Sequence, residues 1–183
     1  MRLAVDGPIM RIRSILVISA LSGLLLLGVT VPATAATTVS VTITGGVLAI
    51  SAPTGSVPLG TRMNTVTGGT ISGALGIVEV SDGRSAAAGA GWIASAISTA
   101  LTPDTGPTIG AALIGYTVGP ITQVGTATYT ANNPVNLTGV SPVLTATGIT
   151  GDNSATWNPT INVAVPGGTA AGTYAGTITH SLI

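Results

Sequence analysis

The chain is poor in the residues on which most protein chemistry depends. It has no cysteine, no phenylalanine and no lysine, and charged residues make up only 5% of its 183 positions. Without cysteine there is no disulfide, no thiolate nucleophile and no zinc–thiolate site. Five basic residues are too few for the basic face that neutralises nucleic-acid phosphates. With one histidine and five carboxylates, the chain also has little material for acid–base catalysis. We therefore expect a protein that is not an enzyme and does not bind nucleic acid.

The N-terminus has the pattern of a secretory signal peptide. Arg11 and Arg13 precede an apolar run over residues 15–31, and Ala33-Thr34-Ala35 follows with the small residues that a signal peptidase recognises. The alternative is an uncleaved membrane anchor. The run has 17 residues and is interrupted by serine and glycine, whereas a helix needs about 20 apolar residues to cross a bilayer. The pattern therefore favours export followed by cleavage.

Cleavage is predicted after Ala35, so that residues 1–35 form the signal peptide and residues 36–183 form one secreted domain. Met10 is an alternative start, because the residues that follow it make a more compact basic region. No later segment approaches 18 uninterrupted apolar residues. We expect the cleaved protein to have no membrane span and to be extracellular or associated with the cell wall.

The secreted part reads as an all-β protein. Residues 38–44 alternate strictly, with Val39, Val41 and Ile43 on one face and threonine or serine on the other. Similar segments follow, separated by turn clusters of glycine, proline, asparagine and aspartate. They cover residues 47–50, 74–80, 91–98, 109–118, 121–130, 143–147, 155–165 and 173–182. Short strands separated by frequent turns predict a single Ig-like antiparallel β-sandwich. The alanine-rich residues 85–90 are expected to form a loop.

The titratable side chains do not suggest a catalytic or metal site. His180 is the single imidazole, and alternation places it on the same face as Ile178 and Leu182. A packed histidine is therefore favoured over a catalytic base, which also needs an orienting partner and a nucleophile. The aspartates of the secreted part lie in separate turns, without the ligand spacing of a calcium loop. We predict that the protein needs no cofactor and no metal ion.

Two tryptophans supply much of the large apolar surface. Trp157 shares the odd-numbered face of its strand with Ile161 and Val163, which favours a place in the core. Trp92 opens a strand after the alanine-rich segment. Two interpretations of Trp92 are open: it packs in the core, or it is exposed, where its ring face stacks on a sugar.

Three segments of the secreted part carry a resemblance. They are Gly91-Trp92-Ile93-Ala94, residues 151–159 (GDNSATWNP) and residues 172–182 (GTYAGTITHSL). Together they resemble secreted actinobacterial proteins related to the WxL-domain surface proteins of Gram-positive bacteria. In that family a proximal Trp-x-Leu motif and a distal Tyr-x-x-x-Ile/Leu-Thr-Trp-x-Leu motif accompany non-covalent attachment to the cell wall. Here the proximal motif ends in alanine, and the distal motif has His180 in place of tryptophan.

The resemblance implies a secreted, non-enzymatic surface protein that associates non-covalently with the cell wall. Its implied partners are peptidoglycan or an associated glycan, and other surface proteins. The candidate wall-binding or motif residues are Trp92, Trp157, Tyr174, Ile178, His180 and Leu182. A different function follows from the low charge and the many strands, because charged residues normally protect strand edges. The alternative is a structural subunit of a self-assembling surface fibre or layer.

Overall fold

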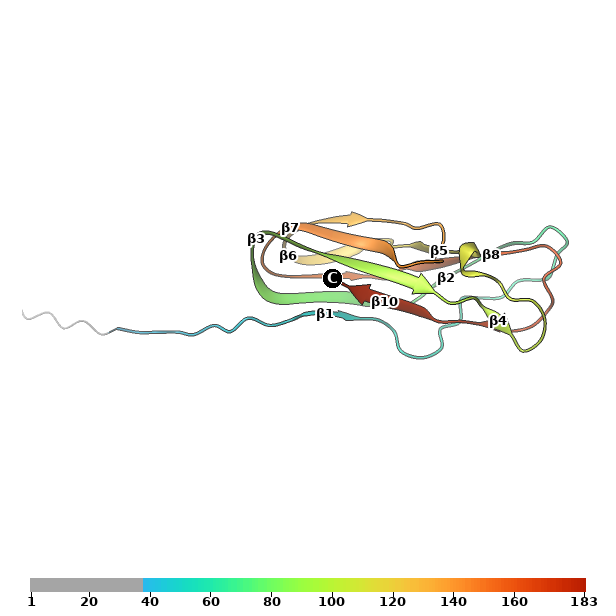
Figure 1. Ribbon diagram of the computed structural model, residues 1–183, viewed down its shortest axis with the longest axis horizontal. Coiled ribbons are helices and arrows are strands. Elements are labelled where there is room, and N and C mark those ends of the chain that lie inside the picture. The colour runs from blue at the N-terminus through green and yellow to red at the C-terminus, as the bar shows by residue number, and fades with distance from the viewer. Residues whose placement is uncertain (1–37) are drawn as a thin grey trace, which may run out of the picture. The chain divides into compact units, whose positions relative to one another are not determined.

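The computed structural model describes residues 38–183, apart from the side chains of residues 86 and 87 (Figure 1). Residues 42–183 form one compact unit. Its elements, in chain order, are β1 (Leu48–Ser51), β2 (Gly69–Ala74), β3 (Val78–Ser98), β4 (Thr102–Pro103), the 3-10 turn η1 (Ala111–Leu113), β5 (Ile114–Thr117), β6 (Ile121–Ala131), β7 (Ser141–Trp157), β8 (Thr160–Val165), β9 (Tyr174–Ala175) and β10 (Ile178–Leu182). All ladders between these strands are antiparallel. The predicted all-β antiparallel sandwich is confirmed. The predicted signal peptide lies outside the described residues.

One layer of the sandwich is formed by strands that follow each other end to end. β8 lies between β2 and β5, and β7 lies between β3 and β6. Near the junction, Thr160 of β8 pairs with Ala74 and Thr117. Trp157 at the end of β7 pairs with Val78 and Ile121. The three-stranded sheet β2–β8–β5 is therefore the continuation of the larger sheet in the same layer.

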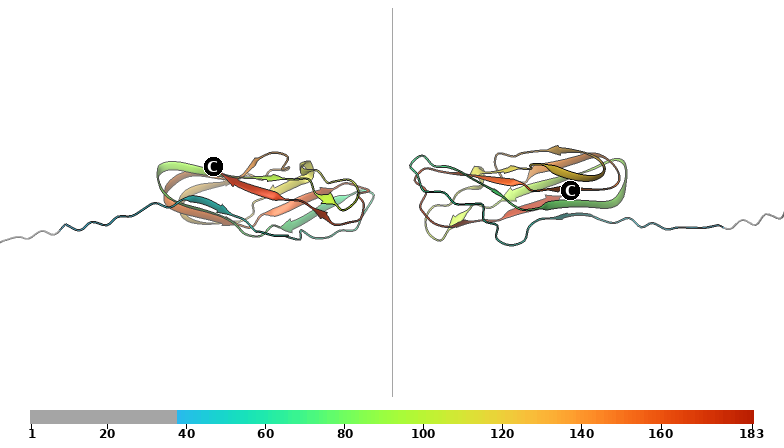
Figure 2. Two further views of the ribbon diagram at one scale, coloured as in Figure 1. Left: turned by 60° about the horizontal axis from the view of Figure 1, so that its bottom comes forward. Right: turned by 180° about the vertical axis from the view of Figure 1, so that it is seen from behind.

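The second layer forms because β3 and β7 bend back together at one end of the unit. The first half of β3 pairs with β1 and the second half pairs with β10, so the two halves lie in different layers (Figures 1 and 2). Glycine makes this bend feasible, because Gly151 has a φ of 71° and a β-carbon on Gly91 would lie 2.7 Å from the carbonyl oxygen of Ala146. The predicted loop over residues 85–90 is wrong. The backbone stays in β3 there because β7 bends alongside and pairs with it.

The core fills the space between the layers. Its largest fully buried side chains are those of Trp92, Trp157, Tyr116, Ile114, Leu137, Leu144, Ile149 and Ile161. Buried valines such as Val78 and Val80 line the inner face of β3. With so few aromatic residues, the three buried rings supply a large share of the buried apolar surface.

The predicted strand over residues 38–44 is wrong. Residues 38–47 lie outside every described strand, and the side chains of Val39, Val41 and Ile43 are 82%, 82% and 87% exposed. The regular ladder starts at Leu48, although the backbones of Gly46 and Val47 still hydrogen-bond Gly83. Alternation makes a segment fit for a strand, but a strand also needs a partner edge.

No helix in the described part of the chain is long and apolar enough to cross a membrane.

Candidate functional site

Two of the motif residues are buried in the core, and the other four are partly buried. Trp92 and Trp157 are only 2% and 1% exposed. The four motif residues near the C-terminus are half-buried: Tyr174, Ile178 and Leu182 pack against the core, and His180 contacts the buried ring of Tyr116. The structure thus supports the interpretation of Trp92 as a core residue, because a buried ring cannot present its face to a sugar.

A polar cluster at the bend of β3 and β7 holds Trp92 in place. The indole Nε1 of Trp92 donates to Oδ1 of Asn153 at 3.0 Å, and Nδ2 of Asn153 donates to Oδ2 of Asp82 at 3.2 Å. The guanidinium of Arg84 donates to both carboxylate oxygens of Asp82, at 2.8 and 2.9 Å. The hydroxyl of Tyr129 donates to Oδ1 of Asn153 at 3.2 Å, and its ring packs against that of Trp92 with centroids 5.7 Å apart.

The charge of this cluster is internally balanced. Hydrogen bonds from Arg84 hold the pKa of the Asp82 carboxyl at about 2, below its usual 3.8, although burial acts in the opposite direction. The same hydrogen bond raises the pKa of Arg84. No buried side-chain nitrogen or oxygen in the described residues lacks a hydrogen-bond partner. The cluster is therefore a closed structural network that fixes the bend.

A second cluster joins His180 to the other tryptophan. Trp157 Nε1 donates to the hydroxyl oxygen of Tyr116 at 2.9 Å, and this hydroxyl lies 3.1 Å from Nε2 of His180. The rings of Tyr116 and His180 meet edge to face, with centroids 5.7 Å apart. Burial lowers the pKa of His180, which favours the neutral imidazole. Burial also raises the pKa of Tyr116.

These partners give His180 a packing role, as its place on an apolar face predicts. It contacts the ring and the hydroxyl of Tyr116, and the raised pKa of this tyrosine opposes deprotonation of the hydroxyl. Within residues 38–183, no three histidine, cysteine, aspartate or glutamate side chains gather in a way that could hold a metal ion.

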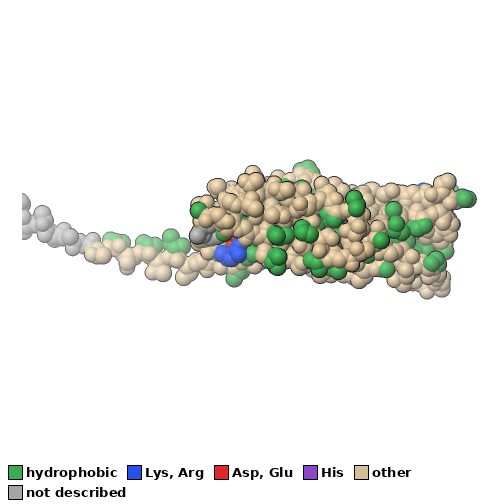
Figure 3. Space-filling model, turned by 45° about the horizontal axis from the view of Figure 1, so that its top comes forward, with side chains coloured by type: hydrophobic (Ala, Val, Ile, Leu, Met, Phe, Trp, Pro, Cys, Tyr) green, Lys and Arg blue, Asp and Glu red, His purple; other side chains and the backbone are tan. Residues whose placement is uncertain are grey.

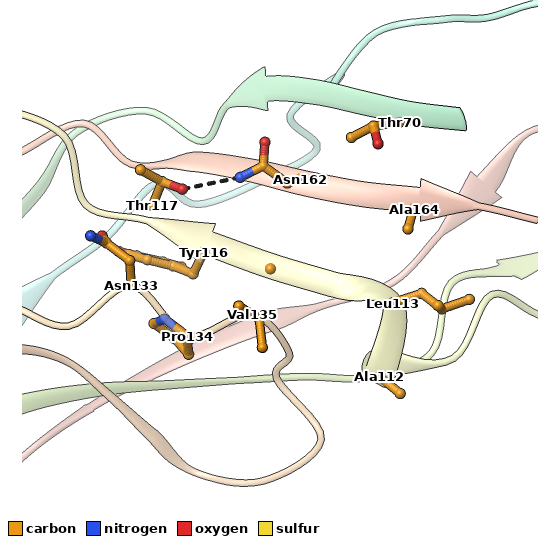
Figure 4. Close-up of a pocket in the computed structure, with 11 residues that line it drawn as sticks. Thr70, Ala112, Leu113, Tyr116, Thr117, Asn133, Pro134, Val135, Asn162 and Ala164 are labelled. Atoms are coloured by element: carbon orange, nitrogen blue, oxygen red, sulfur yellow. Dashed lines mark hydrogen bonds between the residues drawn. The ribbon is translucent and has the colours of Figure 1, made fainter. Parts of the chain in front are cut away.

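A hollow of about 280 Å³ lies over β5 and β8 (Figure 4). Thr117 and Asn162 face each other across these strands, and Nδ2 of Asn162 donates to Oγ1 of Thr117 at 3.1 Å. Oδ1 of Asn162 accepts from Oγ of Ser72 at 2.8 Å, which fixes the orientation of the amide. Asn133 stands at one side of the hollow, and Val135 is one of its apolar walls. Amide and hydroxyl groups thus converge on a concave, uncharged surface.

A second uncharged surface lies on the outer face of β6 and β7. Its cross-strand neighbours are threonine pairs, and the register shifts on both sides of the pair Thr126–Thr150; the other pairs are Thr122 with Thr156, Thr128 with Thr147 and Thr130 with Thr145. All these side chains are exposed or half-buried. Figure 3 shows how little of one face of the molecule is occupied by charged side chains.

Sequence reasoning missed both surfaces. The threonines were visible as strand composition, but their pairing depends on the register of β6 against β7. The hollow depends on the meeting of β2, β5, β8 and the segment around Asn133. Neither arrangement leaves a local signal in the chain.

No protein-family model, curated protein or solved structure matches this chain.

Proposed function

We propose that the protein is a secreted, non-enzymatic protein that associates non-covalently with the bacterial cell wall. Its ligand is peptidoglycan or an associated glycan. Export is supported by the basic region, apolar run and small-residue site that precede residue 36. Wall association is supported by the resemblance of three segments, among them residues 172–182, to WxL-related surface proteins.

The observation that carries the proposal is the uncharged hollow over β5 and β8. Sugars present hydroxyl groups, and peptidoglycan sugars also carry acetamido groups with an amide and a methyl. The side chains of Thr117, Asn133 and Asn162 offer hydroxyl and amide partners, while Val135 offers an apolar wall. A concave surface with a few convergent polar groups is the usual form of a small-ligand site. Because both tryptophans are buried, we expect the protein to bind a sugar through polar contacts and not by stacking an indole ring on it.

The small number of charged side chains determines how binding should depend on salt. Only two arginines, Arg62 and Arg84, lie within residues 38–183, and Arg84 is paired with Asp82. Binding through neutral groups does not depend on ion pairs, so added salt screens little of it. We therefore expect wall association to persist at high ionic strength.

The test is co-sedimentation of residues 36–183 with purified peptidoglycan. The double variant Thr70→Val/Thr117→Val removes two hydroxyls from the hollow but keeps the branched shape that suits a strand. Loss of two hydrogen bonds worth roughly 0.5–1.5 kcal/mol each should weaken binding about 5- to 140-fold. Thr70→Ser/Thr117→Ser, which keeps the hydroxyls, should bind nearly as well as the unaltered protein.

The matched control is Thr126→Val/Thr128→Val on the outer face of β6. It makes the same chemical change away from the hollow, and we expect it to leave binding unchanged. Loss of binding in this control alone would move the site to the threonine pairs and overturn the assignment of the hollow. No sedimentation of the unaltered protein would overturn the proposed function itself.

A further inference from the structure

β6 is the last strand of its sheet and has one free edge. Within residues 38–183 it pairs only with β7, and no backbone group outside that ladder hydrogen-bonds to it. Every residue of β6 except Ile121, Ala127 and Tyr129 is exposed. The N–H and C=O groups along the side away from β7 are therefore open to another chain.

The free edge of β6 lacks the usual protection by charge. Soluble proteins shield edge strands with charged side chains, proline or bulges. β6 has no charge and no proline, and the chain has no charged residue between Asp104 and Asp152. The carboxylate of Asp152 is engaged by β3, because its Oδ1 accepts from the backbone N–H and the hydroxyl of Ser85 at 2.9 and 3.2 Å. No charged side chain of β6 therefore opposes the approach of a second strand.

The bulges of the β6–β7 ladder lie in β7 and not in β6. At the first irregularity Gly125 stands alone between two paired residues of β6, while β7 has three residues there. At the second, Ala127 stands alone while β7 has two. A bulge bends the strand that carries the extra residues. Residues 126–131 of β6 therefore keep the extended form that an incoming strand needs.

β6 contains the tripeptide with which it already pairs in β7. Its residues 128–130 (Thr-Tyr-Thr) lie opposite residues 145–147 (Thr-Ala-Thr) of β7. β6 itself carries Thr-Ala-Thr at residues 126–128. A second β6 in antiparallel orientation places this tripeptide opposite residues 128–130 of the first and receives the same match in return. The free edge is therefore self-complementary.

We propose that two copies of the chain associate through residues 126–130 of β6, antiparallel and about a two-fold axis at Thr128. Thr128 then lies opposite Thr128 of the second copy. Thr126 lies opposite Thr130, and Ala127 lies opposite Tyr129. These pairs repeat the threonine–threonine and alanine–tyrosine pairs of the β6–β7 ladder, and such cross-strand pairs stabilise a sheet.

The proposed contact is symmetric and small. Because both copies use the same surface, the contact is isologous and stops at two copies. Main-chain hydrogen bonds supply affinity, but a ladder over residues 126–130 is smaller than the interface of a permanent dimer. We therefore expect a dimer that dissociates on dilution. This inference concerns contacts between copies and does not depend on wall binding.

The absence of cysteine permits a direct test of the register. Opposite Cα atoms of an antiparallel pair lie about 4.5–5.5 Å apart, within the roughly 4.4–6.8 Å that a disulfide spans. Residues 36–183 carrying Thr128→Cys should therefore form disulfide-linked dimers on oxidation in air. Thr126→Cys and Thr130→Cys should each cross-link poorly alone, because like positions are then offset by four residues, about 14 Å. A mixture of these two variants should cross-link well.

Thr147→Cys is the matched control for the cross-linking. Thr147 is an exposed threonine on the same face, but it lies in β7 and not at the edge. In the proposed dimer the two Thr147 residues are three strand spacings apart, about 14 Å. This separation is beyond the reach of a disulfide, so the control should cross-link about 10-fold less than Thr128→Cys.

Light scattering after size exclusion measures association without any cysteine. The mass of unaltered residues 36–183 should rise toward that of a dimer as the protein concentration increases. Thr128→Lys places two like charges opposite each other at the axis, and we expect this variant to remain a monomer. Thr147→Lys makes the same change on β7 and should dimerise as the unaltered protein does. Far-UV circular dichroism shows that each variant keeps its strands.

Three results would overturn the proposal. They are a monomer of the unaltered protein at millimolar concentration, dimers that persist in folded Thr128→Lys, and equal cross-linking of Thr128→Cys and Thr147→Cys. Cross-linking of Thr126→Cys or Thr130→Cys alone at the level of Thr128→Cys would likewise contradict the two-fold register.

Discussion

Acid should unfold this protein in part through one carboxylate, Asp82. It is 1% exposed, and Arg84 and Asn153 donate hydrogen bonds to it. Its pKa of about 2 in the folded protein compares with a usual 3.8. Because the folded pKa is the lower one, the charged form contributes stability above pH 3.8, and this contribution is lost as the pH falls toward 2.

The size of the effect follows from the two pKa values of Asp82. Each pH unit of difference is worth about 1.4 kcal/mol, so the fall from 3.8 to about 2 contributes about 2 kcal/mol to the free energy of unfolding. Asp82→Asn removes the titrating group while keeping an oxygen that can accept a hydrogen bond. The variant should therefore be less stable than the unaltered protein at pH 7, and the difference should shrink by about 2 kcal/mol between pH 5 and pH 2.

The assay is urea unfolding of residues 36–183 and of the variant at pH 7, 5, 4, 3 and 2, followed by tryptophan fluorescence. Arg84→Gln is the matched control, because the Arg84 hydrogen bond is the largest cause of the lowered pKa of Asp82. In that variant the acid loss should begin nearer pH 4. Parallel stability curves for the unaltered protein and Asp82→Asn below pH 4 would refute the reasoning.

Two further outcomes follow from the second cluster. An NMR titration should give His180 a pKa below 6.5, because burial disfavours the charged ring. The free energy of unfolding should then decrease as the pH falls through 6.5. A pKa at or above 6.5 would contradict the packing of His180 against Tyr116. Trp157→Ala should lower the free energy of unfolding by about 3–5 kcal/mol, since it empties a fully buried site and leaves Tyr116 without its indole donor. Urea unfolding measures this loss, and a change below about 1 kcal/mol would show that the core collapses around the missing ring.

Local patterns predicted the parts of the fold that depend on neighbouring residues. Alternation identified β6 closely, whereas the strand predicted over residues 173–182 is divided between β9 and β10. Alternation also placed Trp157 and His180 on inward faces. The two-residue period of a strand decides which side chains share a face, and it does so whichever strand is the partner.

Features that depend on distant partners were not predictable in this way. Residues 38–44 alternate strictly, yet they pair with no strand in the part of the chain that the structure describes. Residues 85–90 read as a loop, yet the bend of β7 supplies them with pairing partners. The hollow around Asn162 likewise requires three strands and a distant segment to meet. Register and tertiary packing decide each of these outcomes.

The most direct test of the proposed wall association is an NMR titration of isotope-labelled residues 36–183 with soluble peptidoglycan fragments. Backbone amide shifts should change in β5, β8 and the segment around Asn133, and the side-chain amide of Asn162 should move with them. Shifts that saturate with added fragment and remain at high salt would agree with binding through neutral groups. No shift at saturating fragment, or shifts confined to residues away from the hollow, would contradict it.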